Sequence, residues 1–323
     1  MNAPILVTGG AGFIGSHLVD ALLEAGESVV VFDDFNDFYS PRQKRDNLDA
    51  AWAHRRFRLI TGDIRDGTAL EDAVRTHHVR RVVHLAARAG VQPSLRDPVL
   101  YADVNVTGTA AVLQVCARSR VEQVIFASSS SVYGVTAAVP FTEQDAADRP
   151  ISPYATSKRA GELQCWTFHH LTAIPVTCLR FFTAYGPRNR PDMAVYRFAQ
   201  AIRDGRDVVL FGHGTRRDLT FVGDVVGGIL GALEHPQPFL TCNLGRGQPV
   251  AVADVIQELT RLLKRPAVLR QAPLPPGDVP VTWADIRVAR EAIGYRPSVE
   301  LAEGLERFVR WFADIGLEAM VAG

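Results

Sequence analysis

The first half of the chain alternates short runs of β-branched and apolar residues with longer segments of helical periodicity. Six of the runs are typical of buried strands, namely Ile5–Thr8, Val29–Phe32, Arg58–Ile60, Arg81–Leu85, Val124–Ala127 and Val176–Phe181. Strand, helix and strand in repetition indicate parallel strands joined by right-handed crossovers. The pattern therefore predicts an α/β fold built on a doubly wound parallel sheet.

The pattern changes after Phe182. The stretch TAYGPRNRPD, residues 183–192, is rich in Gly, Pro and Arg and predicts an irregular segment without a strand or a helix interior. Beyond it, helices are expected at about 193–205, 224–234, 251–264, 285–293 and 301–314, mixed with short strands. We expect a sheet domain over 1–182 and a smaller α+β substrate-binding domain over 183–323, with part of 218–247 returning to the first domain.

Composition narrows the class of partner by exclusion. Lys plus Arg equals Asp plus Glu, 35 against 35, so no net charge favours nucleic acid or an anionic membrane, and a small-molecule partner is expected. The four cysteines are scattered without metal-ligand spacing, which predicts reduced thiols and no metal site. No run approaches a membrane span and no secretory leader is recognised, so we expect a soluble cytoplasmic protein.

A glycine-rich turn follows the first predicted strand. In VTGGAGFIGSH, Gly9, Gly12 and Gly15 permit a tight turn, close backbone approach to a pyrophosphate and close packing of helix on strand. Asp33 ends the second strand 18 residues after Gly15, near the spacing at which a carboxylate binds the adenosine ribose. Because an acid there repels a 2′-phosphate, the pattern predicts a Rossmann site for NAD rather than NADP.

Further contacts to the cofactor are expected where the predicted strands end. The segments GDI (62–64) and HLAA (84–87) both lie along the path of the cofactor, and His84 is given no chemical role. The predicted contacts are Gly9, Gly12, Phe13, Ile14, Gly15, Asp33, Asp34, Asp63, Ile64, Leu85, Ala86, Ala87, Ser128, Tyr154 and Lys158.

The segment SPYATSKRAGE places Tyr154 four residues before Lys158, so that the two side chains share one face of a helix. Ser129 lies in ASSSSVYG at the end of the fifth strand, and all three side chains can meet at a sugar hydroxyl beside the nicotinamide. A phenol with a pKa of about 10 is a poor base at neutral pH. We expect the Lys158 cation and the positive nicotinamide to lower the pKa of Tyr154, while Ser129 orients the substrate oxygen. The alternative is an ordinary solvated Tyr/Lys pair.

Together these motifs resemble the extended short-chain dehydrogenase/reductase family and its NAD-dependent nucleotide-sugar epimerases. The resemblance extends over TGGAGFIGSHL, HLAARAGV, VNVTGT, ASSSSVYG, YATSK, RFFTAYGPRNRPDMA, RRDLTFVGDV and PGDVPVTWAD. The segments GPRNRPDMA and PGDVPVTWAD are most similar to those of the UDP-glucuronate 4-epimerase subfamily. The resemblance implies NAD as cofactor, a UDP-sugar as substrate and a homodimer formed through helices near 97–119 and 154–171.

The resemblance also implies residue roles by position. Asn105 would steady the active-site backbone and is counted among the cofactor contacts. Arg217 would hold the UDP diphosphate and Asp278 would contact the uridine ribose. Arg190, preferred over Arg188, would meet the C6 carboxylate; the alternative is that both are solvated loop charges. The implied substrate contacts are Ser129, Ser130, Ser131, Thr183, Arg190, Met193, Arg217 and Asp278. Two departures from the subfamily are Gly223 in place of an acid and Gln92-Pro93 in place of a basic-aromatic pair.

The expected activity is 4-epimerisation of UDP-glucuronate to UDP-galacturonate through a transient 4-keto intermediate, without decarboxylation. Epimerisation of UDP-glucose or UDP-N-acetylglucosamine is the first alternative. In sugar 4,6-dehydratases the corresponding segment resembles STDEVYG, and in UDP-glucuronate decarboxylases it resembles TSEVYG. Both contain acids where this chain has Ser130 and Ser131, so these serines count against both activities. A further alternative is an NAD-sensing regulator, which would tolerate the loss of Ser129, Tyr154 or Lys158.

Overall fold

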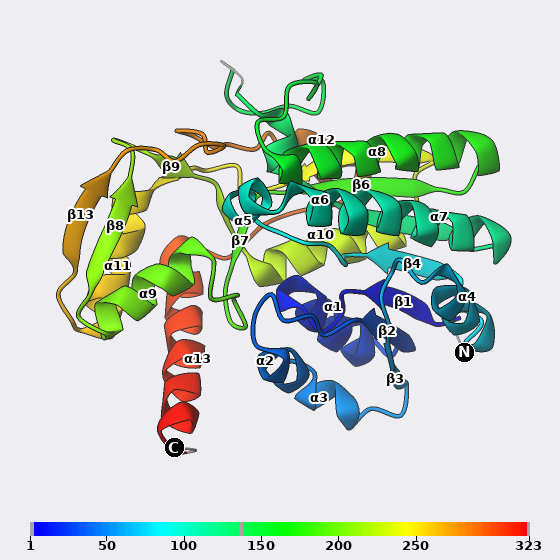
Figure 1. Ribbon diagram of the computed structural model, residues 1–323, viewed down its shortest axis with the longest axis horizontal. Helices are drawn as coiled ribbons and strands as arrows, with labels where there is room; N and C mark the ends of the chain where they lie inside the picture. The colour runs from blue at the N-terminus through cyan, green and yellow to red at the C-terminus, as the bar shows by residue number, and fades with distance from the viewer. Residues whose placement is uncertain (1–2, 136–137, 322–323) are drawn as a thin grey trace.

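The computed structural model describes residues 3–135 and 138–321, with the side chains beyond residue 314 excepted. Its centre is a seven-stranded sheet in the order β11-β6-β5-β4-β1-β2-β3, with every neighbouring pair parallel (Figure 1). This order confirms the predicted doubly wound fold. The strands are β1 (Ile5–Thr8), β2 (Val29–Asp33), β3 (Phe57–Thr61), β4 (Arg81–His84), β5 (Gln123–Ser129), β6 (Val176–Phe181) and β11 (Phe239–Leu244).

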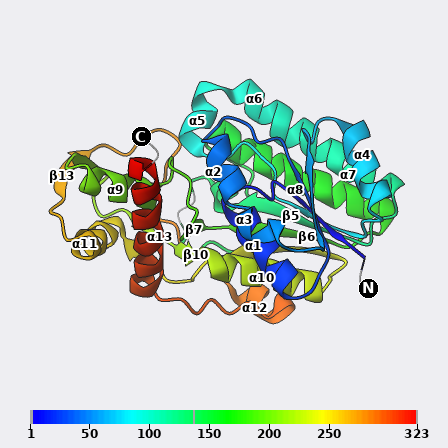
Figure 2. The ribbon, with the colours of Figure 1, turned by 90° about the horizontal axis from the view of Figure 1, so that it is seen from below.

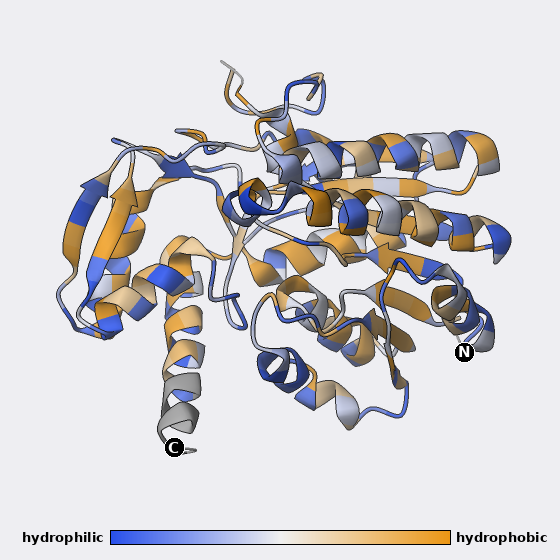
Figure 3. Cartoon of the chain, viewed as in Figure 1, coloured by the Kyte–Doolittle hydropathy of each residue, from blue (hydrophilic) through white to orange (hydrophobic). Residues whose placement is uncertain are grey.

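Alternate residues of each central strand pack into two separate cores, because successive side chains point to opposite faces of a sheet. Ile5 and Val7 pack on one face, and Leu6 packs on the other. Both faces are therefore covered, and Figure 3 shows the central strands as largely apolar. The covering helices are α1 (Phe13–Glu24) and α10 (Val222–Glu234) on one face and α4 (Gly67–Thr76), α7 (Gly108–Arg118) and α8 (Pro153–Thr172) on the other.

The strands predicted from the first half of the chain are all present. The seventh, β11, comes from the second half and pairs with β6, with Leu240 opposite Thr177. Its helix α10 packs against α1. A segment of the second half thus completes the sheet, whereas the division of the chain at 182/183 stays a prediction.

One prediction about this region is wrong. Thr183–Tyr185 forms a short strand, β7, inside the stretch that we expected to be irregular throughout. It pairs in parallel with β10 (Leu219–Phe221), and Ala184 and Tyr185 are buried. Pairing with a segment some 35 positions away, which local sequence does not reveal, supplies the hydrogen bonds that the Gly- and Pro-rich flank lacks.

The remaining elements form a smaller lobe beside the sheet and short segments along its carboxyl edge (Figure 2). The lobe contains β8 (Asp207–Phe211) paired with β13 (Val268–Ala272), β9 (Arg216–Arg217) paired with β12 (Val250–Ala251), and helices α9 (Ala194–Arg203), α11 (Val252–Leu263) and α13 (Leu301–Val321). The other helices are α2 (Pro41–Asp46), α3 (Asp49–Trp52), α5 (Val91–Arg96), α6 (Pro98–Ala102), α12 (Arg287–Ile293), the π-helix η1 (Asp103–Thr107) and the 3₁₀-helix η2 (Ser130–Tyr133).

Among the described residues, one helical stretch is long and apolar enough by length and composition to cross a membrane. It is Pro98–Arg118, which runs through α6, η1 and α7. This stretch packs against α8 and α4 as part of one helical layer of the fold. A single stretch of this kind is weak evidence for a membrane span, since core helices of α/β proteins have the same composition.

Candidate active site

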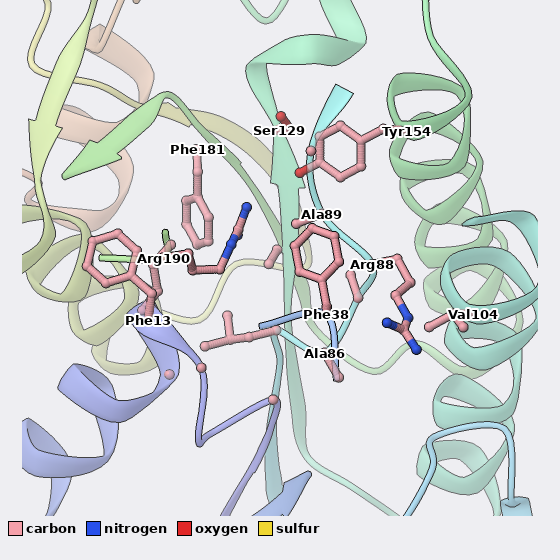
Figure 4. A pocket seen from close by; sticks show the side chains of 18 of the residues that line it. Phe13, Phe38, Ala86, Arg88, Ala89, Val104, Ser129, Tyr154, Phe181 and Arg190 are labelled. Atoms are coloured by element: carbon pink, nitrogen blue, oxygen red, sulfur yellow. The ribbon is translucent and has the colours of Figure 1, made fainter. Parts of the chain in front are cut away.

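A cavity of about 440 Å³ opens at the carboxyl ends of the central strands (Figure 4). Parallel sheets of this type bind ligands at this edge. Most of the residues that the sequence singled out line it: Gly9, Gly12, Phe13, Ile14, Gly15, Asp33, Asp34, Asp63, Ile64, Leu85, Ala86, Ala87, Ser128, Ser129, Ser130, Ser131, Tyr154, Lys158, Thr183, Arg190 and Met193. The predicted residues outside its lining are Asn105, Arg217 and Asp278.

The glycine turn leaves no room for side chains. A Cβ on Gly9, whose φ is +70°, would lie 2.7 Å from the Ala86 nitrogen, and a Cβ on Gly15 would lie 2.2 Å from the Gly9 oxygen. Helix α1 begins after Gly12 without a side-chain cap, so its first N–H groups remain free to face an anion. This turn therefore fits a dinucleotide pyrophosphate.

The two acids after β2 differ in their surroundings. Asp33 is 6 % exposed, and its carboxylate accepts hydrogen bonds from Ala11 N (3.0 Å) and Phe35 N (2.9 Å). Burial raises the pKa of Asp33, although these two hydrogen bonds oppose the shift. Asp34 is exposed and accepts from the Asn36 backbone and side chain. Because carboxylate oxygens accept more than one hydrogen bond, Asp33 can shape this loop and still bind ribose hydroxyls.

Asp63 and Asn105 hold other segments of the cavity wall. Arg65 binds the Asp63 carboxylate through Nε (3.0 Å) and its backbone N (2.8 Å), and these contacts hold the pKa of Asp63 below its usual value. Asn105 is buried behind the wall: it accepts from Arg88 N (2.8 Å) and donates to Arg88 O (2.9 Å) and Ser157 Oγ (2.9 Å). Counting Asn105 among the direct cofactor contacts is thus not supported by its position, whereas the implied steadying of the backbone fits it.

Tyr154 lies in the first turn of α8, whose N-cap Ser152 accepts from Ala155 N (3.1 Å). Its phenol is hydrogen-bonded to Ser129, and Figure 4 shows these two side chains together at one end of the cavity. One helical turn further along, Lys158 Nζ donates to Ala127 O (2.7 Å). The helix and the end of β5 thereby bring the three predicted catalytic side chains into one place.

The expected lowering of the Tyr154 pKa is wrong for the protein alone. Burial raises this pKa, and the opposing contributions come from the Ser129 hydrogen bond and the charge of Arg190. Burial also lowers the pKa of Lys158 to about 8. Lys158 is not among the groups that shift the pKa of the phenol, and its ammonium group donates to the carbonyl of Ala127. The cation acting on Tyr154 is therefore one that local spacing did not indicate.

Arg190 and Arg188 have different environments. The Arg190 guanidinium binds both oxygens of Asp192 through Nε (2.9 Å) and Nη2 (2.8 Å), and it lies 5.6 Å from the ring centre of Phe38. Arg188 Nη1 binds Asp20 on α1 at 2.6 Å, away from the cavity lining. Of the two candidates for the sugar carboxylate, only Arg190 lines the cavity.

Known proteins share this fold. Residues 5–245 match a family model described as "NAD dependent epimerase/dehydratase family". The chain belongs to this family. The predicted family and its NAD cofactor are thereby confirmed.

Relatives in the epimerase/dehydratase family include enzymes that act on more than one sugar. UDP-glucuronate 4-epimerase 2 of Arabidopsis thaliana is 40 % identical over 95 % of this chain and 75 % of its own length. The UDP-glucuronic acid 4-epimerase of Bacillus cereus, solved with UDP-glucuronic acid and NAD, is 34 % identical with a TM-score of 0.91, covering 97 % of this chain and 99 % of that one. The UDP-glucose 4-epimerase of Thermotoga maritima, solved with UDP-glucose, is 33 % identical with a TM-score of 0.89 and the same coverage.

The two residues expected at the UDP of this epimerase/dehydratase member bind each other. Arg217 Nη2 lies 2.8 Å from Asp278 Oδ1, and Arg217 Nη1 donates to Pro280 O (3.1 Å). Nearby, Gln92 Nε2 donates to Pro276 O (2.8 Å), so that this departure from the subfamily joins α5 to the Pro-rich loop. Gly223 lines a separate hollow together with His17 and Arg307. The roles of Arg217 and Asp278 toward UDP stay predictions.

Sequence reasoning missed several polar and aromatic residues of the wall. Arg88 and Asp192 lie within motifs already quoted, HLAARAGV and GPRNRPDMA, and that was the available signal. Phe38, Tyr39 and Lys44 come from the loop after β2 and its helix, where spacing carries no such signal. In the described part of the chain, the Tyr39 hydroxyl and Arg88 Nε are buried without a hydrogen-bond partner.

These groups define the chemistry that the cavity can perform. When bound, NAD⁺ supplies the hydride acceptor. Tyr154 can take the proton of a sugar hydroxyl, and Ser129 can orient that hydroxyl. Phe181 and Phe38 give the cavity aromatic walls.

Proposed function

We propose that the protein interconverts UDP-glucuronate and UDP-galacturonate by oxidation and re-reduction at C4. The observation that carries this proposal is the position of Arg190 and Thr183 in the same cavity as Tyr154, with Ser131 where decarboxylases have an acid. A cation and hydroxyl groups suit a carboxylate on the sugar. The glucuronate epimerases among the relatives support the same substrate.

In this proposal Tyr154 removes the proton of the C4 hydroxyl while the hydride leaves C4, and it returns a proton after the ring has turned. The 4-keto uronate is a β-keto acid, which loses CO₂ when its C5–carboxylate bond stands perpendicular to the carbonyl plane. Thr183, Ser130 and Ser131 hold the carboxylate so that this alignment is avoided. Arg217 keeps the diphosphate in place during the rotation.

A second candidate is 4-epimerisation of UDP-glucose, and the likeness to the Thermotoga enzyme supports it. The cation of Arg190 favours UDP-glucuronate over UDP-glucose, because the neutral C6 hydroxyl of glucose needs no cation. Decarboxylation is less favoured, since Ser131 offers no carboxylate. A regulator without catalysis is less favoured because Ser129, Tyr154 and Lys158 meet at the cavity.

The test is product analysis by NMR with UDP-glucuronate, UDP-glucose and UDP-N-acetylglucosamine in separate reactions. UDP-galacturonate should dominate in the first reaction, without steady release of NADH, because epimerisation has no net redox change. UDP-xylose or a 4-keto pentose as the main product would identify a decarboxylase. Faster turnover of UDP-glucose than of UDP-glucuronate would replace the substrate assignment.

We also propose that the protein is a soluble cytoplasmic homodimer whose interface is the outer face of α7 and α8. Large apolar side chains are exposed there or close by: Val99 is 76 %, Leu163 53 % and Trp166 51 % exposed. Clustered exposed apolar groups are typical of interaction sites. Sedimentation of the protein and of Leu163→Glu tests this, with a dimer expected for the first and a monomer for the second. The four free, buried cysteines are consistent with a reducing compartment.

A further inference from the structure

The sugar end of the cavity contains an acid that no step so far uses. Asp192 lines the cavity together with Arg190, and both of its carboxylate oxygens accept hydrogen bonds from the Arg190 guanidinium, at 2.9 and 2.8 Å. Their side chains are 33 % and 19 % exposed, so water screens this pair only partly. The cation expected to recognise an acidic sugar is therefore already paired within the protein.

The geometry of this pair leaves part of the guanidinium available. Arginine has five N–H donors, and Asp192 uses one on Nε and one on Nη2. Among the described residues, these are the hydrogen bonds that the Arg190 guanidinium makes, so both N–H donors of Nη1 and one of Nη2 remain. In Figure 4 the nitrogen-bearing end of Arg190 extends between the rings of Phe181 and Phe38.

Two further loops lie beside the pair. Phe38, from the loop after β2, lies against the Arg190 guanidinium. On the other side, Asp192 Oδ2 lies 3.7 Å from the position that a Cβ would take on Gly90, in the loop after β4. The charge of Arg190 reaches Tyr154, whose pKa it lowers. Any change in the charge balance of the pair is thus felt where the C4 hydroxyl reacts.

We propose that Asp192 determines how strongly the site prefers acidic sugars, by competing with the substrate carboxylate for Arg190. This inference rests on the proposed function. A carboxylate approaching the Nη1 end gains hydrogen bonds from Arg190 but meets the negative charge of Asp192 beyond it. The acidic sugar is consequently bound through directed hydrogen bonds without the full attraction of an unpaired cation.

Weaker binding of the substrate carboxylate by Arg190 assists epimerisation. The 4-keto ring has to leave its first position, turn about the diphosphate link and bind again with its other face toward the cofactor. A carboxylate held by an unpaired guanidinium would be released slowly, because tighter binding of a ground state raises the barrier to leaving it. Asp192 weakens that hold, so that the ring can rotate within one turnover.

The experiment replaces the charge of Asp192 and keeps its shape. In a Tyr154→Phe background, calorimetry of Asp192→Asn should show UDP-glucuronate bound about tenfold more tightly, equivalent to about 1.4 kcal/mol, and UDP-glucose changed by less than about twofold. With Tyr154 intact, kcat for UDP-glucuronate should fall together with KM. Asp192→Glu, which restores the charge, should return both values toward those of the wild type.

The matched control changes the neighbouring ion pair, in which Arg188 of the same loop binds Asp20 on α1. Asp20→Asn removes the partner of Arg188 without changing the cavity, and should leave both affinities unchanged. Asp192→Ser carries the same prediction as the amide and serves if Asp192→Asn does not fold. If Asp192→Asn bound both UDP-sugars equally more weakly, Asp192 would only maintain the loop. If both affinities were unchanged, Asp192 would not compete with the substrate for Arg190. Either result overturns the proposal.

Failure of this inference and failure of the proposed function are separate. The affinity ratio of the two sugars tests Asp192 and does not depend on turnover. The identity of the product formed by the wild type tests the epimerase assignment and does not depend on Asp192. If Asp192→Asn bound UDP-glucuronate tenfold more tightly but the wild type formed no UDP-galacturonate, the role of Asp192 would stand and the epimerase assignment would fail.

Discussion

Glu162 has a buried carboxylate that accepts four hydrogen bonds, and replacing it by Gln should destabilise the protein severely. Glu162 is 2 % exposed and accepts from Arg180 Nε (2.8 Å) and Nη2 (2.9 Å), Ser128 Oγ (2.5 Å) and Arg159 Nη1 (2.8 Å). It lies one turn beyond Lys158 on α8, and Arg180 is on β6. These bonds fasten the catalytic helix to the sheet beside the cavity-lining Ser128.

The magnitude follows from the burial of both charges. Arg180 is 3 % exposed, and within the described part of the chain its Nη1 has no hydrogen-bond partner. Removing one member of such a pair leaves the other charge buried without compensation, which costs about 3–5 kcal/mol. Gln also presents an amide N–H₂ where Glu162 accepts hydrogen bonds. For a chain of this size we expect the Tm to fall by about 5 °C or more.

The pH dependence of folding stability tests independently whether the charge of Glu162 stabilises the protein. Burial alone would raise the pKa of Glu162, but the hydrogen bonds from Arg180 and its other donors outweigh burial and hold it below the ordinary 4.5. A carboxyl with a depressed pKa stabilises the folded state fully above its unfolded pKa and loses that contribution as the pH falls through its folded pKa. The difference in stability between wild type and Glu162→Gln should therefore be constant near neutrality and shrink below about pH 4.5.

The assay is thermal unfolding of both proteins between pH 3 and 8, supported by urea unfolding at pH 7. Glu258→Gln on the surface of α11 is the control, because its Arg261 partner is solvated, and its Tm should match the wild type. Glu162→Gln with a Tm within 1 °C of the wild type at pH 7 would refute the reasoning. An equal loss of stability at every pH would show that packing, and not charge, is responsible.

Three further predictions concern the site. Tyr154→Phe should lower kcat by about 10²–10⁴-fold while UDP-sugar binding persists, as measured by single-turnover kinetics and calorimetry, and unchanged turnover would remove the assigned base. Arg190→Ala should abolish most of the preference for UDP-glucuronate over UDP-glucose, worth about 1.5–3 kcal/mol in the ratio of kcat/KM values; a ratio equal to that of the wild type would exclude Arg190 as the carboxylate partner. Gly15→Ala should prevent copurification of NAD, because its Cβ would lie 2.2 Å from the Gly9 oxygen. Gly67→Ala, whose Cβ would meet nothing within 4 Å, should retain NAD, and NAD bound to Gly15→Ala at wild-type occupancy would contradict the role of the turn.

The sequence by itself determined six of the seven central strands and the cofactor turn. Strand positions follow from runs of apolar residues, and the function of Gly9 and Gly15 follows from their place directly after β1. The pairing of Tyr154 with Lys158 on one helix face likewise depends only on spacing. All of these are local patterns, in which the residues that interact are close along the chain or repeat with the period of one element.

The tertiary structure decided which charges meet. Arg190 binds Asp192 in the cavity whereas Arg188, two residues earlier, binds Asp20 on α1, and nothing in the local pattern separates the two arginines. The direction of Lys158 toward Ala127 O and the burial of Asn105 behind the wall are of the same kind. Each of these contacts joins segments that are far apart in the sequence and meet only in the folded chain. Burial then sets the pKa of the groups that the fold brings together.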